Sequence, residues 1–288
     1  MRKFLLVCSL CLLLFFVLFR YYQYRWTNLW IFEDERKLYP VAYHDDDTLR
    51  MAMIGDSWAA MHSDLDSALQ SKLKKQTGLP VKMISKGKGG EKSRGIYQLL
   101  FEENDKNGTK SIIASGIDYC IISAGINDAA ANVGSHLYCY HMRLILNFLL
   151  SNNIRPILIE IPDVNIWHVY KDKPLKDLAS DYIRSLMSHC KMYQIKEYRD
   201  SLQSLIVNEQ LMDSVIYISM SEWNGNHPNI NKNLFLSDQI HLNVNGYDLL
   251  DSCIANAIDA DLKSKHLRRG ASFSYPMNGD TNYTTKNH

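Results

Sequence analysis

One serine and one histidine lie in short segments where a catalytic pair could be assembled. Ser57 belongs to the segment Gly-Asp-Ser-Trp, which follows an apolar stretch, and His241 ends the segment Asp-Gln-Ile-His. A serine hydroxyl becomes a nucleophile when a histidine accepts its proton, and a carboxylate then holds that histidine in the required tautomer. Asp238 precedes His241 by three residues, so one short turn can direct both side chains toward the same cleft. The pattern predicts acyl-transfer chemistry by Ser57, His241 and Asp238.

Acyl transfer also requires hydrogen-bond donors for the oxyanion of the tetrahedral intermediate. Three donors are available in segments that follow apolar stretches: the backbone N–H groups of Ser57 and Gly90 and the side-chain amide of Asn127. A glycine suits the second donor because the backbone must approach the substrate closely. Gly89 is an alternative to Gly90. Asp128, next to Asn127, is expected to order its loop by local hydrogen bonds.

Apolar strand patterns alternate with amphipathic helix patterns from about residue 46 onward. The expected strands are 49–54, 81–84, 119–124, 156–161 and 215–219, and the expected helices are 59–75, 93–103, 138–151, 175–190, 200–210 and 244–258. Such alternation predicts βαβ units with right-handed crossovers and a parallel sheet between helical layers. Ligands of an open parallel sheet bind at the carboxyl ends of its strands. The candidate residues follow those ends, so the fold would bring them together.

The four segments resemble the four sequence blocks of the SGNH (GDSL-like) hydrolase family, in the same order. The resemblance covers about residues 49–258 and aligns Ser57, Gly90, Asn127 and the pair Asp238 and His241 with the residues of the family's catalytic site. It implies a three-layer α/β/α sandwich with a flavodoxin-like parallel sheet, and neither a metal nor an organic cofactor. In this chain Trp58 replaces the leucine that often follows the serine, which would place an aromatic wall near the nucleophile.

The N-terminal residues form a candidate membrane segment. Residues 4–19 are uncharged and almost wholly apolar, Arg2 and Lys3 precede them, and an aromatic flank with two arginines follows. No small-residue cleavage site follows the run, which favours an uncleaved signal anchor over a cleaved signal peptide. We therefore expect an anchor at 1–25, a linker at 26–45, the catalytic domain at 46–262 and a disordered tail at 263–288. The catalytic domain would be periplasmic or otherwise extracytoplasmic, or secreted if the segment were cleaved.

Composition and charge exclude a disordered protein, a collagen-like protein and a disulfide scaffold. With 46% hydrophobic and 22% charged residues the chain is an ordinary globular protein, and its net charge of +1 argues against nucleic acid as a partner. The cysteines outside the apolar segment match no CxxC metal site, and Cys120 in an apolar strand pattern is expected to be a buried free thiol. His62 and His227 have no partner in the sequence pattern and are expected to be structural or solvated.

The leading functional hypothesis is a membrane-anchored serine esterase that acts through an acyl-enzyme intermediate. The loop at 221–236 is rich in asparagine and contains Trp223 and Phe235, a combination suited to sugar binding, so O-acetyl groups on carbohydrates or cell-envelope glycans are the expected substrate. Four alternatives remain open: a lipase or lysophospholipase, a thioesterase, a glycan O-acetyltransferase, and a catalytically silent glycan-binding module. Apart from a small-molecule or glycan ester, the membrane is the expected partner.

Overall fold

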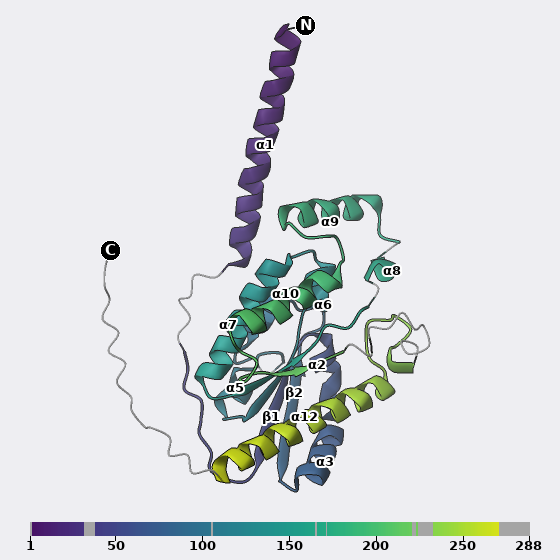
Figure 1. Ribbon diagram of the computed structural model, residues 1–288. Coiled ribbons are helices and arrows are strands. Elements are labelled where there is room, and N and C mark those ends of the chain that lie inside the picture. The colour runs from purple at the N-terminus through teal and green to yellow at the C-terminus, as the bar shows by residue number, and fades with distance from the viewer. Residues whose placement is uncertain are drawn as a thin grey trace, which may run out of the picture.

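The chain folds around a five-stranded parallel sheet with the strand order β2-β1-β3-β4-β5 (Figure 1). The computed structural model describes residues 2–31, 38–104, 106–164, 166–170, 172–220, 223 and 233–270. The strands are β1 (Leu49–Gly55), β2 (Val81–Gly87), β3 (Tyr119–Ser123), β4 (Arg155–Ile159) and β5 (Ile216–Ile218). All four neighbouring pairs are parallel. This is the flavodoxin-like order, and it confirms the predicted α/β fold class.

Burial of the central strands explains their nearly unbroken apolar sequence. All five residues of β3 are buried, and six of the seven residues of β1 are buried, as expected for strands covered by helices on both faces. Cys120 of β3 is fully buried and has a free thiol, as its sequence context predicted. The edge strand β2 alternates more, because one of its sides has no neighbouring strand.

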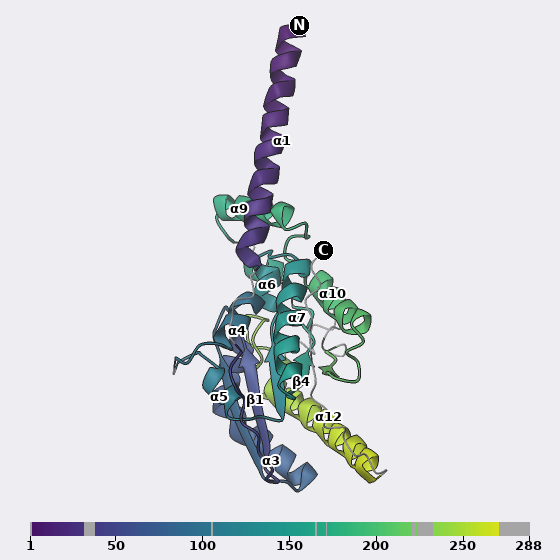
Figure 2. The same cartoon turned by 90° about the vertical axis from the view of Figure 1, so that its left-hand side faces the viewer.

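Helices cover both faces of the sheet. One layer is formed by α2 (Ser57–His62), α3 (Asp66–Thr77) and α12 (Val244–Gly270), and the other by α4 (Ser93–Leu99), α7 (Ser135–Ser151) and α10 (Ile195–Asn208). The short helices α5 (Lys110–Ala114), α6 (Ile126–Ala130) and α8 (Ile166–Tyr170) and the longer α9 (Leu175–Met187) lie outside these layers or at their edges (Figures 1 and 2). The result is a three-layer α/β/α sandwich.

The helix expected at 59–75 is divided into two. α2 ends at His62, a 3₁₀ turn follows at Ser63–Leu65, and α3 begins at Asp66. The turn separates α2, at the carboxyl end of β1, from α3, which packs on β2. Leu69 and Leu73 of α3 are fully buried, so the apolar spacing of four residues did identify the core-facing side of this helix.

The N-terminal segment is one long helix that projects away from the domain. α1 (Arg2–Trp30) contains a window of mean hydropathy 2.5 with no buried residue, and it is long and apolar enough to cross a membrane. Figures 1 and 2 show that its amino-terminal end points away from the sandwich and its carboxyl end meets the domain. The helix continues through residues 26–30, the first part of the expected linker. At the other terminus α12 continues to Gly270, and residues 271–288 of the expected tail lie outside the described residues.

Candidate active site

The structure joins Ser57, His241 and Asp238 in one chain of hydrogen bonds. Ser57 is the first residue of α2, directly beyond the carboxyl end of β1. Its Oγ lies 2.9 Å from Nε2 of His241, and Nδ1 of the same imidazole lies 2.6 Å from Oδ2 of Asp238. The His241 side chain is 30% exposed. The three groups therefore have the connectivity of a serine hydrolase triad, and their location at the surface leaves them open to a substrate.

A tight turn places the side chains of Asp238 and His241 next to each other. Oδ1 of Asp238 accepts hydrogen bonds from the backbone N–H groups of Ile240 and His241, both at 2.9 Å. Gln239 between them has φ of +60°, and the turn is closed where Leu236 N–H donates to the His241 carbonyl at 2.7 Å. Partial burial raises the pKa of the Asp238 carboxyl, but hydrogen bonds from the His241 side chain and from the two backbone amides outweigh it and lower the pKa below its ordinary value. Asp238 thus stays ionised beside the imidazole.

Asp56 supports the turn that carries Ser57. It is the N-cap of α2, and its Oδ1 accepts hydrogen bonds from Trp58 N–H at 3.0 Å and from the Ser123 hydroxyl at 2.9 Å. Burial raises the pKa of the Asp56 carboxyl to about 6, although these hydrogen bonds favour its ionised form. Gly55 before it approaches β3 so closely that a Cβ would lie 2.1 Å from the Ser123 carbonyl oxygen. Only glycine fits there, which explains the first residue of this segment.

Asn127 connects the two other segments of the candidate oxyanion site. Its side-chain Nδ2 donates to the carbonyl oxygen of Glu91 at 3.0 Å and lies 3.4 Å from Oδ2 of Asp56. Glu91 follows Gly90, and Asp56 precedes Ser57. The amide of Asn127 is therefore held between the neighbours of the two expected backbone donors, and all four sequence segments meet at the carboxyl edge of the sheet.

Gly90 occupies a backbone conformation that favours glycine. Glu91 N–H donates to the Lys88 carbonyl at 3.1 Å, which closes a four-residue turn with Gly89 and Gly90 at its centre. Gly90 has φ of +74°, as the third residue of a type II turn requires, whereas the φ of Gly89 lies outside the positive range. A Cβ on either residue would meet nothing within 4 Å. Conformation therefore explains glycine at position 90, and position 89 has no such requirement.

Trp58 is not the aromatic wall that its position beside Ser57 suggested. Its side chain is 1% exposed, and its ring packs against Phe235 with the centroids 6.3 Å apart. The indole Nε1 donates to the carbonyl oxygen of Ile240 at 3.1 Å. Trp58 thus connects the turn that carries Ser57 to the turn at residues 236–241 (the histidine turn) from inside the protein.

The sugar-binding role expected for Trp223 and Phe235 is contradicted by their burial. Trp223 is 3% exposed and Phe235 is 5% exposed, and their rings meet edge to face at 6.4 Å. Both belong to the core under the histidine turn, so neither offers a flat face to a glycan. The rest of the asparagine-rich loop, at 221–222 and 224–232, lies outside the described residues, as does His227.

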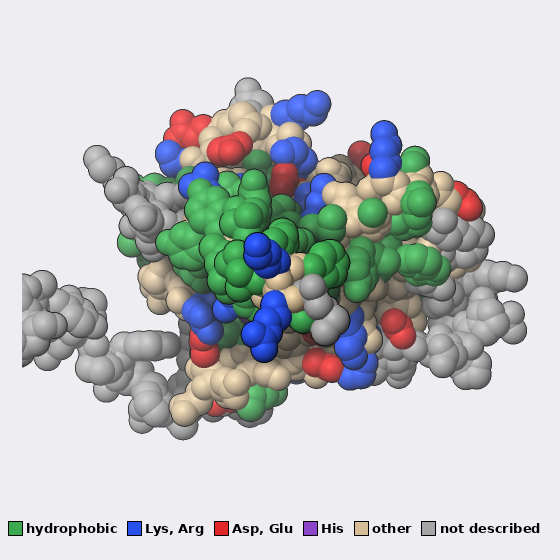
Figure 3. Space-filling view, turned by 90° about the horizontal axis from the view of Figure 1, so that it is seen from above, with side chains coloured by type: hydrophobic (Ala, Val, Ile, Leu, Met, Phe, Trp, Pro, Cys, Tyr) green, Lys and Arg blue, Asp and Glu red, His purple; other side chains and the backbone are tan. Residues whose placement is uncertain are grey.

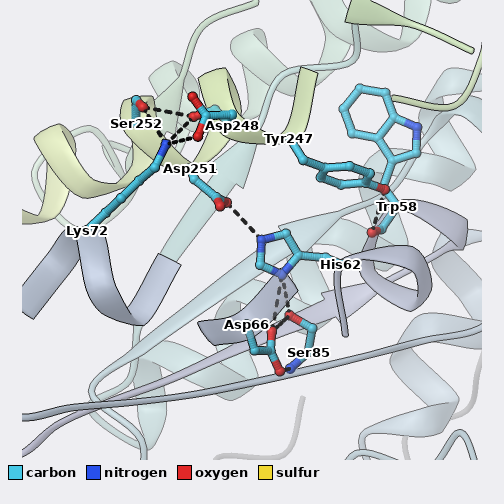
Figure 4. Close-up of polar contacts among 9 residues, drawn as sticks. All are labelled: Trp58, His62, Asp66, Lys72, Ser85, Tyr247, Asp248, Asp251 and Ser252. Carbon is cyan, nitrogen blue, oxygen red and sulfur yellow. Dashed lines mark hydrogen bonds and ion pairs between the residues drawn. The ribbon is translucent and has the colours of Figure 1, made fainter. Parts of the chain in front are cut away.

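A buried polar cluster fastens α2 to α12 behind the site (Figure 4). Nε2 of His62 lies 2.8 Å from Oδ1 of Asp251, and its Nδ1 lies 2.8 Å from the Ser85 Oγ and 3.2 Å from Oδ1 of Asp66. Burial lowers the pKa of the imidazole, but the hydrogen bonds and charges of Asp251 and Asp66 outweigh it and raise the pKa to about 9. His62 is structural, as expected, but it has three polar partners that the sequence pattern did not show.

The same cluster includes a direct contact between α12 and the turn that carries Ser57. The Tyr247 hydroxyl donates to the Trp58 carbonyl oxygen at 3.0 Å, and the Tyr247 ring lies edge-on to His62 at 5.7 Å. α12 begins three residues after His241. α2, which carries Ser57, and α12, which follows His241, are therefore hydrogen-bonded to each other at two residues of α2, Trp58 and His62 (Figure 4).

Asp128 acts at longer range than expected. Its carboxylate accepts hydrogen bonds from the Ser93 backbone N–H at 2.9 Å and from the Ser93 hydroxyl at 2.6 Å, across 35 residues of sequence. Burial raises the pKa of Asp128 to about 6 against these hydrogen bonds. The residue ties the Asn127 loop to the start of α4, so its contacts are not the local ones predicted.

Comparisons with known proteins support the fold. No family model matches the chain, and no curated protein sequence matches it. Among solved structures, a lipase from a goat rumen metagenome has a TM-score of 0.50 at 13% identity, over 73% of this chain and 97% of that one. A variant of an acetyl-xylooligosaccharide esterase from Geobacillus stearothermophilus has a TM-score of 0.50 at 16% identity, over 73% and 94%. The chain shares its α/β/α fold with both structures, in agreement with the fold class that the sequence blocks predicted.

Proposed function

We propose that the protein is a serine esterase that hydrolyses carboxylic esters through an acyl-enzyme intermediate. The observation that carries this proposal is the hydrogen-bonded series from the Ser57 Oγ through His241 to Asp238, with contacts of 2.9 Å and 2.6 Å. A site of this connectivity removes a proton from the hydroxyl as it attacks and returns it to the leaving alcohol.

The steps follow from the positions of these groups. The Ser57 Oγ attacks the ester carbonyl carbon while its proton passes to Nε2 of His241, and the imidazolium is stabilised by ionised Asp238. Collapse of the tetrahedral intermediate breaks the bond to the alcohol oxygen, which takes the proton from His241. Water then attacks the acyl-serine with His241 as the base, which releases the carboxylic acid and restores Ser57.

The oxyanion site is assigned to the backbone N–H groups of Ser57 and Gly90 and to the Asn127 amide. The positive φ of Gly90 supports its choice over Gly89. Asn127 already donates a 3.0 Å hydrogen bond to Glu91, and its contact with Asp56 is long at 3.4 Å. The hydrogen of that weaker contact is the one that can serve an oxyanion.

For the substrate we propose O-acetyl esters of carbohydrates, with the domain held at the membrane by α1 on its extracytoplasmic side. Support comes from the shared fold with the acetyl-xylooligosaccharide esterase. The loop at 221–236 gives no support for a sugar substrate through its aromatic side chains, because Trp223 and Phe235 are buried. The shared fold with a lipase favours one alternative, the hydrolysis of long-chain esters.

The test uses the full chain in detergent, with p-nitrophenyl acetate and p-nitrophenyl octanoate at equal concentration. Ser57→Ala should abolish turnover of both esters, and the control Ser63→Ala, which changes an exposed serine six residues away, should leave it intact. Faster release from the acetate supports an acetylesterase, and faster release from the octanoate supports the lipase alternative. Equal turnover by wild type and Ser57→Ala would refute the proposed mechanism.

A further inference from the structure

α9 exposes an apolar face that no other described element covers. Leu175, Tyr182, Ile183 and Leu186 are 82%, 57%, 51% and 45% exposed. At 3.6 residues per turn these positions lie on one side of the helix. Asp181 and Ser185, on another side, are buried against the domain. The neighbouring helix α8 adds Trp167, which is 49% exposed. We call Leu175, Tyr182, Ile183, Leu186 and Trp167 the apolar face.

The buried side of α9 is hydrogen-bonded to the domain through Tyr193, and this contact leaves the apolar face outward. The Asp181 carboxylate accepts hydrogen bonds from Lys173 Nζ at 2.8 Å and from the Tyr193 hydroxyl, and Arg184 contacts its other oxygen at 3.1 Å. The carboxylate is therefore paired with two cations and a hydroxyl. These contacts anchor α9 by its buried side and leave the apolar face outward.

The carboxyl end of α1 is docked on the end of α9. Gln23 is 6% exposed, and its Nε2 donates to the Met187 carbonyl at 3.2 Å. One turn further, Trp26 Nε1 donates to the Ser188 hydroxyl at 2.7 Å. At the end of α1, the Trp30 carbonyl oxygen accepts a hydrogen bond from Nε2 of His141 in α7 at 2.7 Å. Burial lowers the pKa of His141 to about 4, so the imidazole is neutral and donates through Nε2. α1 therefore has a fixed attachment to the domain.

α9 lies across the direction of α1 in both Figure 1 and Figure 2. The two views differ by a quarter turn about the vertical axis, so α9 runs along the surface of a bilayer that α1 crosses close to its normal. Viewed from above, hydrophobic side chains are exposed on this end of the molecule, both on α1 and beside it (Figure 3).

The level of α9 along α1 corresponds to the edge of a bilayer. The uncharged residues 4–19 of α1 would span about 24 Å, slightly less than the roughly 30 Å of a hydrocarbon core. The edge of the core then falls near Arg20 and the two tyrosines that follow it, Tyr21 and Tyr22. Gln23 and Trp26, which contact Met187 and Ser188, lie within two turns of that edge. At that level the outward side chains of α9 would lie near the boundary between headgroups and acyl chains.

We propose that the apolar face of α8 and α9 lies in the interface of the bilayer that α1 crosses, so that the domain contacts lipid through a second element besides its anchor. The proposal requires α1 to be a membrane span and is independent of the esterase activity. Lipid is the partner because the face is continuous with the docked end of α1 and oriented toward the same bilayer. Exposed aromatic and aliphatic side chains on an amphipathic helix are typical of such interfacial binding.

The test measures depth in a membrane with the full chain. Ile183→Cys is labelled with a nitroxide in protein reconstituted into phosphatidylcholine and phosphatidylglycerol vesicles, and collisions with oxygen and with a water-soluble nickel chelate are compared. Val207→Cys is the matched control, because Val207 is 60% exposed near the carboxyl end of α10, at the amino edge of the sheet. The labelled unsubstituted chain provides the background from the native cysteines.

We expect the label at position 183 to lose nickel collisions and to gain oxygen collisions relative to position 207. Equal nickel access at both positions, in protein that floats with the vesicles, would show that α1 is an anchor but that the apolar face is not at the lipid. Protein that does not float with the vesicles would overturn the proposal by removing its premise. Hydrolysis of a soluble ester in the same samples reports separately on the proposed esterase.

Discussion

The indole of Trp58 donates a hydrogen bond to the carbonyl oxygen of Ile240, and this 3.1 Å contact joins the residue after Ser57 to the residue before His241. The two catalytic candidates are 184 positions apart in sequence, yet their immediate neighbours are directly hydrogen-bonded at the edge of the core. The position of the imidazole relative to the hydroxyl is thus set by a buried contact below the site as well as by the bond between the two groups.

Trp58→Phe should lower kcat. The substitution removes the indole N–H and keeps an aromatic ring against Phe235, so the histidine turn loses one restraint. A single hydrogen bond of about 0.5–1.5 kcal/mol corresponds to a loss of about two- to tenfold in kcat. Trp223→Phe makes the same chemical change in the same aromatic cluster and serves as the control. If both variants lost turnover equally, the bond to Ile240 would have no special role.

Asn127→Ala should reduce kcat by roughly a hundred- to a thousandfold if its amide stabilises the oxyanion. KM should change little, because the developing negative charge is present only in the transition state. Steady-state kinetics on p-nitrophenyl acetate provides the measurement. Asn256→Ala, which removes an exposed amide from α12, should have wild-type kinetics. An unchanged kcat in Asn127→Ala would remove this residue from the oxyanion site.

Alanine substitutions should separate Gly90 from Gly89. At Gly90 the φ of +74° costs an L-residue about 1–2 kcal/mol, although the added Cβ would meet open space. Gly89→Ala should change the free energy of unfolding by less than about 0.5 kcal/mol, since its Cβ also meets open space and its φ is not positive. Denaturant unfolding measures both. Equal destabilisation by the two substitutions would contradict the turn geometry.

The His62 cluster should make stability depend on pH above neutrality. The folded-state pKa of His62, about 9, is above the ordinary value of 6.5 because of its contacts with Asp251 and Asp66. Its contribution is therefore fully present below pH 6.5 and is lost as the pH rises through 9. The free energy of unfolding should fall by at most about 3 kcal/mol across that interval.

Urea unfolding of wild type and His62→Gln at several pH values measures this effect. The variant should be less stable at pH 6.5 and should lack the decline between pH 6.5 and 9. His44→Gln is the control, since His44 also lies beside two carboxylates but near the surface. A decline of the same size in His62→Gln would assign the pH dependence to other groups.

The sheet and the meeting of the sequence segments could be predicted because both depend on local patterns. β1 and β3 begin at Leu49 and Tyr119, as the apolar stretches indicated, since a strand buried on both faces is apolar along its whole length. The carboxyl ends of parallel strands share one edge, so Ser57 and Asn127 had to come close. Asn127 is in fact within hydrogen-bonding distance of the residue before Ser57.

The contacts behind the site could not be predicted, because they depend on which side of an element faces the core. Asp251 is 189 residues from His62, and no periodicity pairs them. A tryptophan in a polar loop can face a ligand or the interior, and Trp223 faces the interior. The attachment of α1 was missed for a similar reason, since Gln23 and Trp26 lie in an aromatic segment that suits a membrane interface and a protein contact equally.

The attachment of α1 to the domain determines where the candidate active site can meet a substrate. A domain on a flexible linker sweeps a wide volume around its anchor, and its active site can meet substrates at many heights and angles. Here the hydrogen bonds of Gln23, Trp26 and Trp30 hold the end of α1 against the domain. An active site held in this way on a membrane-spanning α1 would meet substrates at one height and one orientation above the bilayer, and it would reach new ones by lateral diffusion.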